Sequence, residues 1–274
     1  MEPLAILDGR VMPAGQATIP VTDEGLLRGD GVFEVIRLYA GVPYALDEHL
    51  VRIARSAANL RLELDAAEVR ADIETLLSAA GPVDAALRFL VTRGGRRIGL
   101  VEPLAELPMS IALATVVFAP TRVMDGVKSL SYAANMLTRR LAQEQGADDA
   151  LLLTPHGRVL EGPTAAFFGV LRGRLVTPPL SEHILDSITR RKVMAVSDAR
   201  EQVLTREDLP ALQEAFLAST LREVHPVHVI DDAALPVVPG PRTAMVAEAV
   251  SALVADELAA AGRGPSAAPV DRRA

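Results

Sequence analysis

The periodic pattern of apolar side chains in this 274-residue chain lapses over residues 119–126, near its middle. On both sides of the lapse, strand-like and helix-like segments follow one another. Their order is too irregular for a repeated strand–helix–strand array. The sequence therefore predicts an α+β fold of mixed α and β elements. It comprises a small α/β domain at residues 1–118, a linker at 119–126 and a larger domain at 127–261.

The hydrophobic spacing places the main elements within these two parts. In the first part we expect strands at residues 4–7, 32–39, 85–92 and 108–118, a helix that begins at Asp47, and a helix at 66–78. In the second part we expect strands at 150–154, 165–171 and 215–219, and helices at 134–144, 187–200, near 211 and at 243–260. Residues 262–274 are polar and aperiodic, which predicts a disordered tail.

Composition excludes several classes of partner. The chain has 28 basic and 35 acidic residues, and the net charge of −7 argues against nucleic acid as the main partner. The absence of cysteine excludes disulfides, thiolate metal sites and cysteine nucleophiles. The longest apolar stretch, residues 111–119, is too short to span a membrane, and the first residues do not resemble a signal peptide. We therefore expect a cytoplasmic protein without a membrane partner.

The sequence lacks the motifs of several common sites. It has no glycine-rich nucleotide motif, no zinc-protease motif and no serine-hydrolase motif. The five histidines are scattered, and only His225 and His228 lie close together in the chain. Strand alternation would put these two on opposite faces, so we expect structural histidines and no metal site.

Three segments have a high density of glycine, hydroxyl and charged residues. They are residues 23–37 (DEGLLRGDGVFEVIR), residues 127–162, which begin with VKSLSY and end with VLEG, and the pair SITR at 187–190 and STLREVHPV at 219–227. In this order they resemble the class IV aminotransferases, which depend on pyridoxal 5′-phosphate (PLP), over roughly residues 1–255. That family includes D-amino-acid and branched-chain aminotransferases, (R)-amine transaminases and aminodeoxychorismate lyase. The resemblance implies fold type IV, with PLP in the cleft between two domains.

The resemblance assigns the groups that hold the reactive part of the cofactor. Lys128 would form the Schiff base with PLP and shuttle the substrate proton. The other lysine of the chain, Lys192, lies on a charged helix face, and we expect it to be solvated. Glu161 would face the pyridine nitrogen and keep it protonated, so that the ring accepts electrons. Tyr132, four residues after Lys128, resembles the phenol that hydrogen-bonds the cofactor's O3′.

The resemblance also implies a site for the cofactor phosphate. Arg52 matches the family's phosphate-binding arginine. Ile188 and Thr189 begin a predicted helix, and helix N-termini bind phosphate through free amide groups and the helix dipole. Thr220 and Leu221 resemble a second turn rich in amide groups.

The substrate class depends on the residues that bind the substrate carboxylate. An arginine binds a carboxylate with two parallel hydrogen bonds. We expect this role for Arg28, which would reach across a homodimer interface, together with Arg96 or Arg97. Phe33 and Val35 would line the substrate pocket, on a strand that resembles the D-amino-acid type. Branched-chain enzymes favour glycine where Val35 stands.

The sequence leaves alternatives open for substrate and for Arg28. Ser187, Pro163 and Ala165 stand at positions where the family usually has other residues, so the subfamily is not fixed. Arg28 also has a structural alternative, an ion pair with Glu24 or with the aspartate two residues after it. The preferred prediction is transfer of an amino group from a D-amino acid to a 2-oxo acid, with (R)-amines as side substrates. The alternatives are a branched-chain L-amino-acid aminotransferase and an aminodeoxychorismate lyase.

Overall fold

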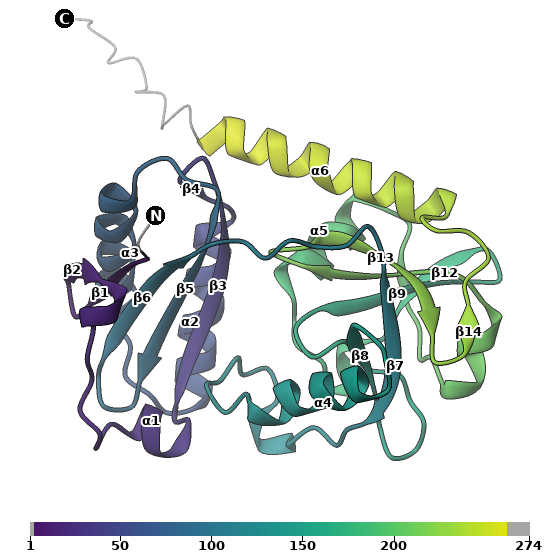
Figure 1. The fold of residues 1–274 in the computed structure, drawn as a ribbon, viewed down its shortest axis with the longest axis horizontal. Helices are drawn as coiled ribbons and strands as arrows, with labels where there is room; N and C mark the ends of the chain where they lie inside the picture. The colour runs from purple at the N-terminus through teal and green to yellow at the C-terminus, as the bar shows by residue number, and fades with distance from the viewer. Residues whose placement is uncertain (1–2, 262–274) are drawn as a thin grey trace, which may run out of the picture.

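The computed structural model describes residues 3–261 and contains two β-sheets side by side, each with its own helices (Figure 1). This arrangement of sheets and helices agrees with the predicted α+β fold. The predicted tail at residues 262–274 lies outside the described residues.

The first half of the chain forms a six-stranded sheet in the order β2-β1-β6-β5-β3-β4. Its strands are β1 (Leu4–Leu7), β2 (Arg10–Pro13), β3 (Gly31–Tyr39), β4 (Val42–Pro43), β5 (Ala85–Thr92) and β6 (Arg97–Glu102). Its helices are η1 (Ala14–Gln16), α1 (Glu24–Arg28), α2 (Leu46–Asn59) and α3 (Ala66–Ala80).

The second half forms an eight-stranded sheet in the order β11-β10-β9-β12-β13-β7-β8, with β14 paired to β13. Its strands are β7 (Ile111–Val117), β8 (Asp149–Leu153), β9 (Ala166–Leu171), β10 (Arg174–Thr177), β11 (Arg200–Glu201), β12 (Leu212–Ser219), β13 (Glu223–Ile230) and β14 (Ala233–Ala234). Its helices are η2 (Arg122–Met124), α4 (Ala133–Glu144), η3 (Leu180–Glu182), α5 (Ile188–Val196), η4 (Arg206–Ala211) and α6 (Pro241–Ala261).

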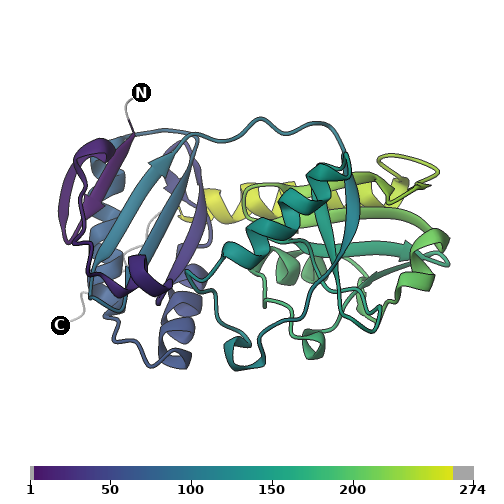
Figure 2. The same cartoon turned by 60° about the horizontal axis from the view of Figure 1, so that its bottom comes forward.

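Alternation along β3 determines which side chains the first sheet buries under its helices. Even-numbered side chains of β3 face α2 and α3. The resulting core includes Val32, Ile36 and Leu38 of β3, Ile53 of α2, and Ile73 and Leu76 of α3. Odd-numbered side chains point away from these helices, and Phe33 among them contacts Tyr132 of the second half. Figure 2 shows the two halves side by side from a second direction. The hydroxyl of Tyr39 donates to Glu223 Oε1 of β13 over 2.6 Å.

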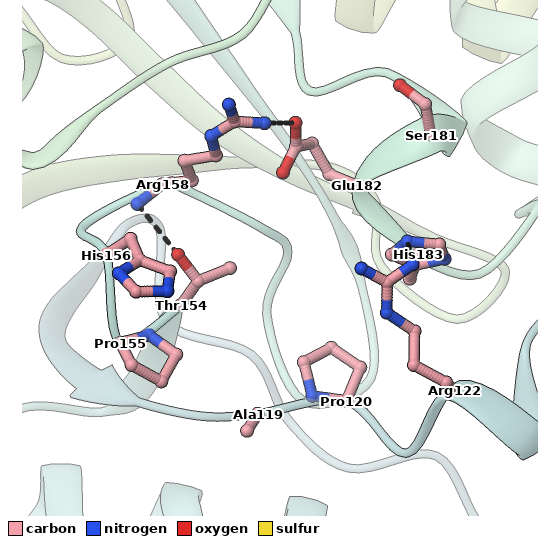
Figure 3. Close-up of a pocket in the computed structure, with 10 residues that line it drawn as sticks. All are labelled: Ala119, Pro120, Arg122, Thr154, Pro155, His156, Arg158, Ser181, Glu182 and His183. Carbon is pink, nitrogen blue, oxygen red and sulfur yellow. Dashed lines mark hydrogen bonds and ion pairs between the residues drawn. The ribbon is translucent and has the colours of Figure 1, made fainter.

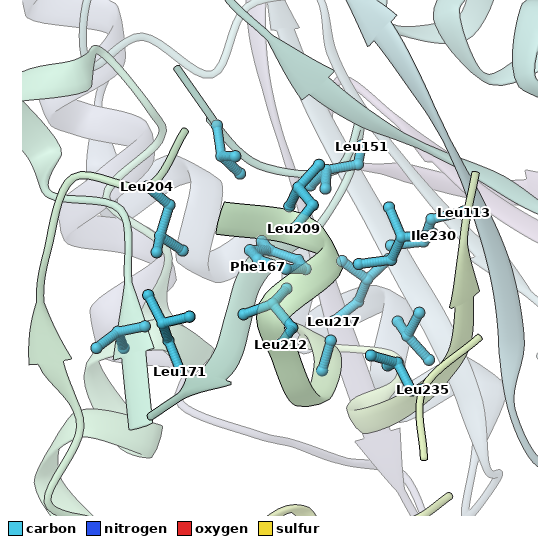
Figure 4. Packing of buried hydrophobic residues seen from close by; sticks show 14 of the residues in the cluster. Leu113, Leu151, Phe167, Leu171, Leu204, Leu209, Leu212, Leu217, Ile230 and Leu235 are labelled. Atoms are coloured by element: carbon cyan, nitrogen blue, oxygen red, sulfur yellow. The ribbon is translucent and has the colours of Figure 1, made fainter. Parts of the chain in front are cut away.

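Apolar cores cover both faces of the second sheet. All residues of β8 and β9 are buried, as is usual for strands that are covered on both sides. On one face, Phe167 and Leu217 pack with Leu209 of η4 (Figure 4). On the other, Phe168 and Phe216 stack at 4.9 Å under α5 and α6. Burial on both faces gives this half a rigid base for the segments at its edge.

The position of strand β7 corrects the predicted domain boundary. The sequence analysis assigned this strand to the first domain and put the linker at residues 119–126. In the structure β7 pairs with β8 and β13 of the second sheet. The chain therefore crosses between the sheets over residues 103–110. A short apolar strand has the same pattern in either sheet, so periodicity could not assign it.

The described residues contain two structural histidines where the sequence suggested them. His225 is buried and its Nε2 donates to the carbonyl oxygen of Pro108 over 2.7 Å, whereas His228 is exposed. Within residues 3–261 no group of three acidic or histidine side chains is placed to hold a metal ion. Over the same residues, every helix is too short or too polar to cross a membrane.

Candidate active site

Lys128 lies on the edge of the first sheet, although the strands before and after it belong to the second. The Phe33 amide donates to the carbonyl of Lys128 over 3.1 Å, and the Leu130 amide donates to Gly31 over 2.9 Å. The Lys128 Nζ lies 4.4 Å from the centroid of the Phe33 ring and 5.4 Å from that of Tyr132. Backbone pairing and two aromatic rings thus fix the amine against the open face of β3.

The environment of Lys128 favours its neutral form. Burial lowers the pKa of Lys128 to about 8, against the opposing negative charges of Glu34 and Glu161. Arg52 and Arg88 lower this pKa further. A neutral amine is the nucleophilic form, so this lysine is suited to attack a carbonyl group near neutral pH.

Glu161 is a half-buried residue on the segment that follows β8. Its Oε1 accepts a hydrogen bond from the Leu185 amide over 3.0 Å. Burial raises the pKa of Glu161 to about 7, although this amide and the charge of Lys128 act in the opposite direction. Among residues 3–261 it has no ion pair with a basic side chain. A carboxylate of this kind fits a ligand that presents a positively charged N–H group.

Tyr132 stands at the start of α4, between Lys128 and the segment after Glu161. Its hydroxyl donates to the Pro163 carbonyl over 2.8 Å, and its ring meets the Phe33 ring edge-on at 5.1 Å. Burial raises the pKa of Tyr132 above its usual range, so the phenol stays protonated. Its oxygen retains the capacity to accept a hydrogen bond.

The N-terminus of α5 provides free amide groups close to Arg52. Ser187 caps this helix through its side-chain hydroxyl. The amide groups of Ile188 and Thr189 belong to the first turn, where a helix has no internal acceptor for them. Arg52 is buried, and its Nη1 donates to the carbonyl of Asp186 over 3.4 Å. The structure thus brings together a cation and a helix N-terminus, which is a common phosphate-binding arrangement.

Thr220 and Leu221 occupy the turn between β12 and β13, and both are partly exposed. The Tyr39–Glu223 hydrogen bond ties the end of this turn to β3 of the first sheet. The turn therefore lies at the junction of the two halves, as the site predicted from sequence requires.

Arg97 is not brought to Lys128. It belongs to the opposite face of the first sheet, where its Nε donates to Asp72 Oδ2 over 2.7 Å and its Nη1 pairs with Glu68 of α3 at 2.6 Å. Arg96 is likewise occupied, by Asp8 at 2.6 Å. These two arginines follow a turn, and the strand register that orients them was not evident from the loop sequence.

Arg28 lies exposed at the end of α1 and forms an ion pair with Glu24. This is the structural alternative that the sequence left open. Within the single chain the structure describes, Arg28 is thus turned to solvent rather than toward the site.

Arg88 is a site residue that the sequence analysis missed. Arg88 stands opposite Val35 on the adjacent strand β5, so both side chains project from the same face of the sheet as Phe33. Its positive charge opposes the protonated form of Lys128. Its Nε donates to Glu102 Oε2 over 2.9 Å. The signal was one charged residue inside the apolar strand sequence ALRFLVT.

Arg37 is a second missed cation on this face, two residues after Val35. Its Cζ lies 5.0 Å from the centroid of the Tyr39 ring. Its Nε is buried and has no hydrogen-bond partner within residues 3–261. The open face of β3 and β5 therefore has two guanidinium groups beside its apolar side chains.

A cavity of about 440 Å³ lies elsewhere in the second half and contains none of the predicted site residues (Figure 3). Arg158 at its rim pairs with Glu182 at 2.5 Å. His183 contacts both Asp125 and Arg122. Because these charged side chains already pair with one another, we assign this cavity no role in binding.

Comparison with known proteins identifies the family. Residues 31–230 match the model of amino-transferase class IV. The chain belongs to this family. It is 34% identical to a putative branched-chain-amino-acid aminotransferase of Methanocaldococcus jannaschii, over 82% of this chain and 87% of the relative. It is 29% identical to a D-alanine aminotransferase of Bacillus licheniformis, over 93% and 98%.

Solved structures confirm the fold. The branched-chain aminotransferase of Thermoproteus uzoniensis, solved with norvaline, superposes with a TM-score of 0.85 at 30% identity, over 93% of this chain and 95% of that one. The predicted family, fold type IV and PLP as cofactor are thereby confirmed.

The residues of this chain fit PLP. The Lys128 amine, whose pKa is lowered, suits its aldehyde. The Glu161 carboxylate, without a basic ion-pair partner in the described chain, suits a protonated ring nitrogen. Arg52 at the N-terminus of α5 suits its phosphate.

Proposed function

We propose that this aminotransferase moves the amino group of a D-amino acid to a 2-oxo acid. The observation that carries the proposal is the placement of Arg88 beside Val35 and Phe33, on the face that carries Lys128. A guanidinium beside an apolar wall suits a substrate with a carboxylate and a small side chain. Val35, where branched-chain enzymes favour glycine, supports the D-amino-acid type, as does the similarity to a D-alanine aminotransferase.

Each cofactor-binding residue has a separate task in this proposal. PLP supplies the electron-accepting ring and the carbonyl carbon that carries the amino group. Lys128 would bind that carbon and afterwards move the substrate's α-proton through its Nζ. Glu161 would hold a proton on the ring nitrogen. With the cofactor bound, the Tyr132 hydroxyl would donate to the ring's O3′ instead of to the Pro163 carbonyl.

The phosphate site would be shared between the two halves of the chain. Arg52 comes from the first half. Ile188, Thr189, Thr220 and Leu221 come from the second and would supply amide and hydroxyl donors. The phosphate would thus help to hold the two halves together.

Arg28 would complete the carboxylate site from a second copy of the chain. In one chain it is exposed, and the neighbouring side chains Leu26 and Leu27 are 58% and 59% exposed. Exposed apolar residues in adjacent positions are typical of an interaction surface. We therefore propose a homodimer, in which Arg28 of the partner subunit would face Arg88.

The experiment that tests the substrate is a comparison of three amino donors. PLP-loaded protein is mixed separately with D-alanine, L-leucine and (R)-phenylethylamine while the cofactor absorbance is followed. Conversion to the pyridoxamine form by D-alanine, faster than by the other two, is the expected result. No conversion by D-alanine, with conversion by L-leucine, would overturn the proposal.

Arginine variants test the carboxylate site. Arg88→Ala and Arg28→Ala should each raise the KM for D-alanine about tenfold or more, because each removes a charged hydrogen-bond donor. Neither should change the KM for (R)-phenylethylamine much, since this amine has no carboxylate. Arg97→Lys is the matched control and should leave the ratio of the two KM values unchanged. Equal losses with both donors would exclude the clamp.

A branched-chain L-amino-acid aminotransferase is the second candidate, favoured by the 34% identity to the Methanocaldococcus jannaschii protein. Reaction with L-leucine and not D-alanine would select it. If no donor reacts while the cofactor is bound, aminodeoxychorismate becomes the substrate to try, since one relative is an aminodeoxychorismate lyase of Bacillus subtilis.

A further inference from the structure

Glu34 is a buried carboxylate between the first sheet and α2, and the roles proposed above leave it unused. It is 1% exposed and points from β3 into the helix-covered side of the sheet. Its two oxygens accept hydrogen bonds from Arg52 Nε at 2.7 Å and Arg52 Nη2 at 2.6 Å. It also accepts from His49 Nδ1 at 2.8 Å. A carboxylate is therefore bound by two parallel bonds to the arginine that faces α5.

This pairing leaves Arg52 with one nitrogen directed at the phosphate site. Two of its three nitrogens are held by Glu34, and the third, Nη1, lies 3.4 Å from the Asp186 carbonyl at the start of α5. The two bonds fix the plane of the guanidinium. A long side chain without them would have several rotamers, and an anion would have to select one of them. Glu34 thus fixes the direction of the donors that an anion at α5 meets.

His49 donates a hydrogen bond to Glu34 but does not supply the positive charge that balances this carboxylate. His49 is fully buried, and burial lowers its pKa below the usual value although Glu34 opposes this change. The neutral ring donates from Nδ1, while its Nε2 has no hydrogen-bond partner in the described chain. Arg52 therefore supplies the charge that balances Glu34, and the Arg52 hydrogen bonds lower the pKa of Glu34 to about 2 against the effect of burial.

We propose that Glu34 is a positioning residue for the reaction: it aims Arg52 at the cofactor phosphate through two parallel hydrogen bonds. This proposal rests on the proposed function, because it takes Arg52 as the phosphate ligand.

The first test compares PLP with pyridoxal, which lacks the phosphate. In the Glu34→Gln variant, binding of PLP to the apoprotein should weaken about tenfold, whereas binding of pyridoxal stays within about twofold. Asp72→Asn is the matched control, because Asp72 is also buried and also accepts from an arginine, Arg97, on the same side of the sheet. It should leave the ratio of the two dissociation constants unchanged.

A second variant keeps the test decisive if Glu34→Gln does not fold. Glu34→Asp keeps the charge but shortens the side chain, so the two parallel hydrogen bonds to Arg52 are lost. This variant should also weaken the binding of PLP relative to that of pyridoxal.

The possible results separate the two proposals. If the unmodified protein fails to bind PLP more tightly than pyridoxal, the phosphate site of the proposed function is wrong. If it does prefer PLP and the Glu34 variants weaken PLP and pyridoxal equally, Glu34 has only a structural role.

Discussion

The two lysines of the chain occupy two regions with opposite electrostatics. Lys192 Nζ lies 2.6 Å from Glu48 and 2.7 Å from Glu257, and these carboxylates raise its pKa against the effect of burial. Lys128 is surrounded by aromatic rings and, within residues 3–261, forms no ion pair. Both side chains are partly buried. The comparison teaches that a partly buried lysine keeps its charge where carboxylates contact it, and favours its neutral form where no such contact offsets burial.

The largest expected difference between the regions is in activity. Lys128→Ala should reduce transamination at least about 1,000-fold, because it removes the nucleophile and the proton carrier together. Lys192→Gln should keep the activity within about threefold. Steady-state rates with the best amino donor measure both. Comparable losses in the two variants would show that the regions do not differ in function.

The second-largest expected difference is in how much the carboxylates of the two regions contribute to kcat. Glu161→Gln should lower kcat about 100-fold, since an amide cannot hold a proton on the ring nitrogen. Glu48→Gln, which removes an ion-pair partner of Lys192, should have little effect on kcat. Rates measured at saturating PLP separate a loss of chemistry from a loss of cofactor. Full activity of Glu161→Gln would remove Glu161 from the site.

The pH dependence of acylation should sharpen the comparison. With a pKa of about 8, Lys128 in the apoprotein becomes mostly neutral as the pH rises from 7 to 9, whereas the raised pKa of Lys192 keeps that amine protonated. A limiting amount of an acylating reagent should therefore label Lys128 about tenfold faster than Lys192 near pH 8. Peptide mass spectrometry measures the ratio. Equal labelling would contradict the assigned environments.

The smallest expected effect is on the stability of the apoprotein. The folded pKa of Lys128 lies below its unfolded value, so this lysine costs stability below pH 8, and the cost falls as the pH rises toward 10.5. Lys128→Met should raise the free energy of unfolding by about 1 kcal/mol at pH 7. Lys192→Met should lower it by a similar amount, because Glu48 and Glu257 lose their partner. Denaturant titrations that gave the same sign for both would refute this difference.

The sequence predicted most elements but not how they are arranged. The helices near α3, α4 and α6 and the strands β5, β8 and β9 appear close to the expected positions, since their spacing of apolar residues is regular. The sheet to which β7 belongs depends on long-range pairing, which a local pattern does not contain. Strand β6 (RIGLVE) was missed because charged residues at both of its ends interrupt the apolar pattern.

For the site, motif resemblance and geometry succeeded at different positions. The structure places the motif residues Lys128, Glu161 and Arg52 close enough for their charges to influence one another. Arg97 was wrongly placed, because one residue of strand register decides which face of the sheet it occupies. Arg88 was overlooked for the same reason. The expectation that Lys192 is solvated was also wrong, because its carboxylate partners come from distant helices.

Residues 128–130 pair with β3 of the first sheet, although in the sequence they lie between two strands of the second sheet. Lys128 is fastened to the first sheet, while Glu161 follows β8 of the second. A protease cut within residues 103–110 should therefore yield two fragments that co-elute as one nicked particle. The second fragment would stay bound to the first because its residues 128–130 hydrogen-bond to β3. The spacing between amine and carboxylate is consequently set by how two bodies dock, and substitutions far from both groups can tune it.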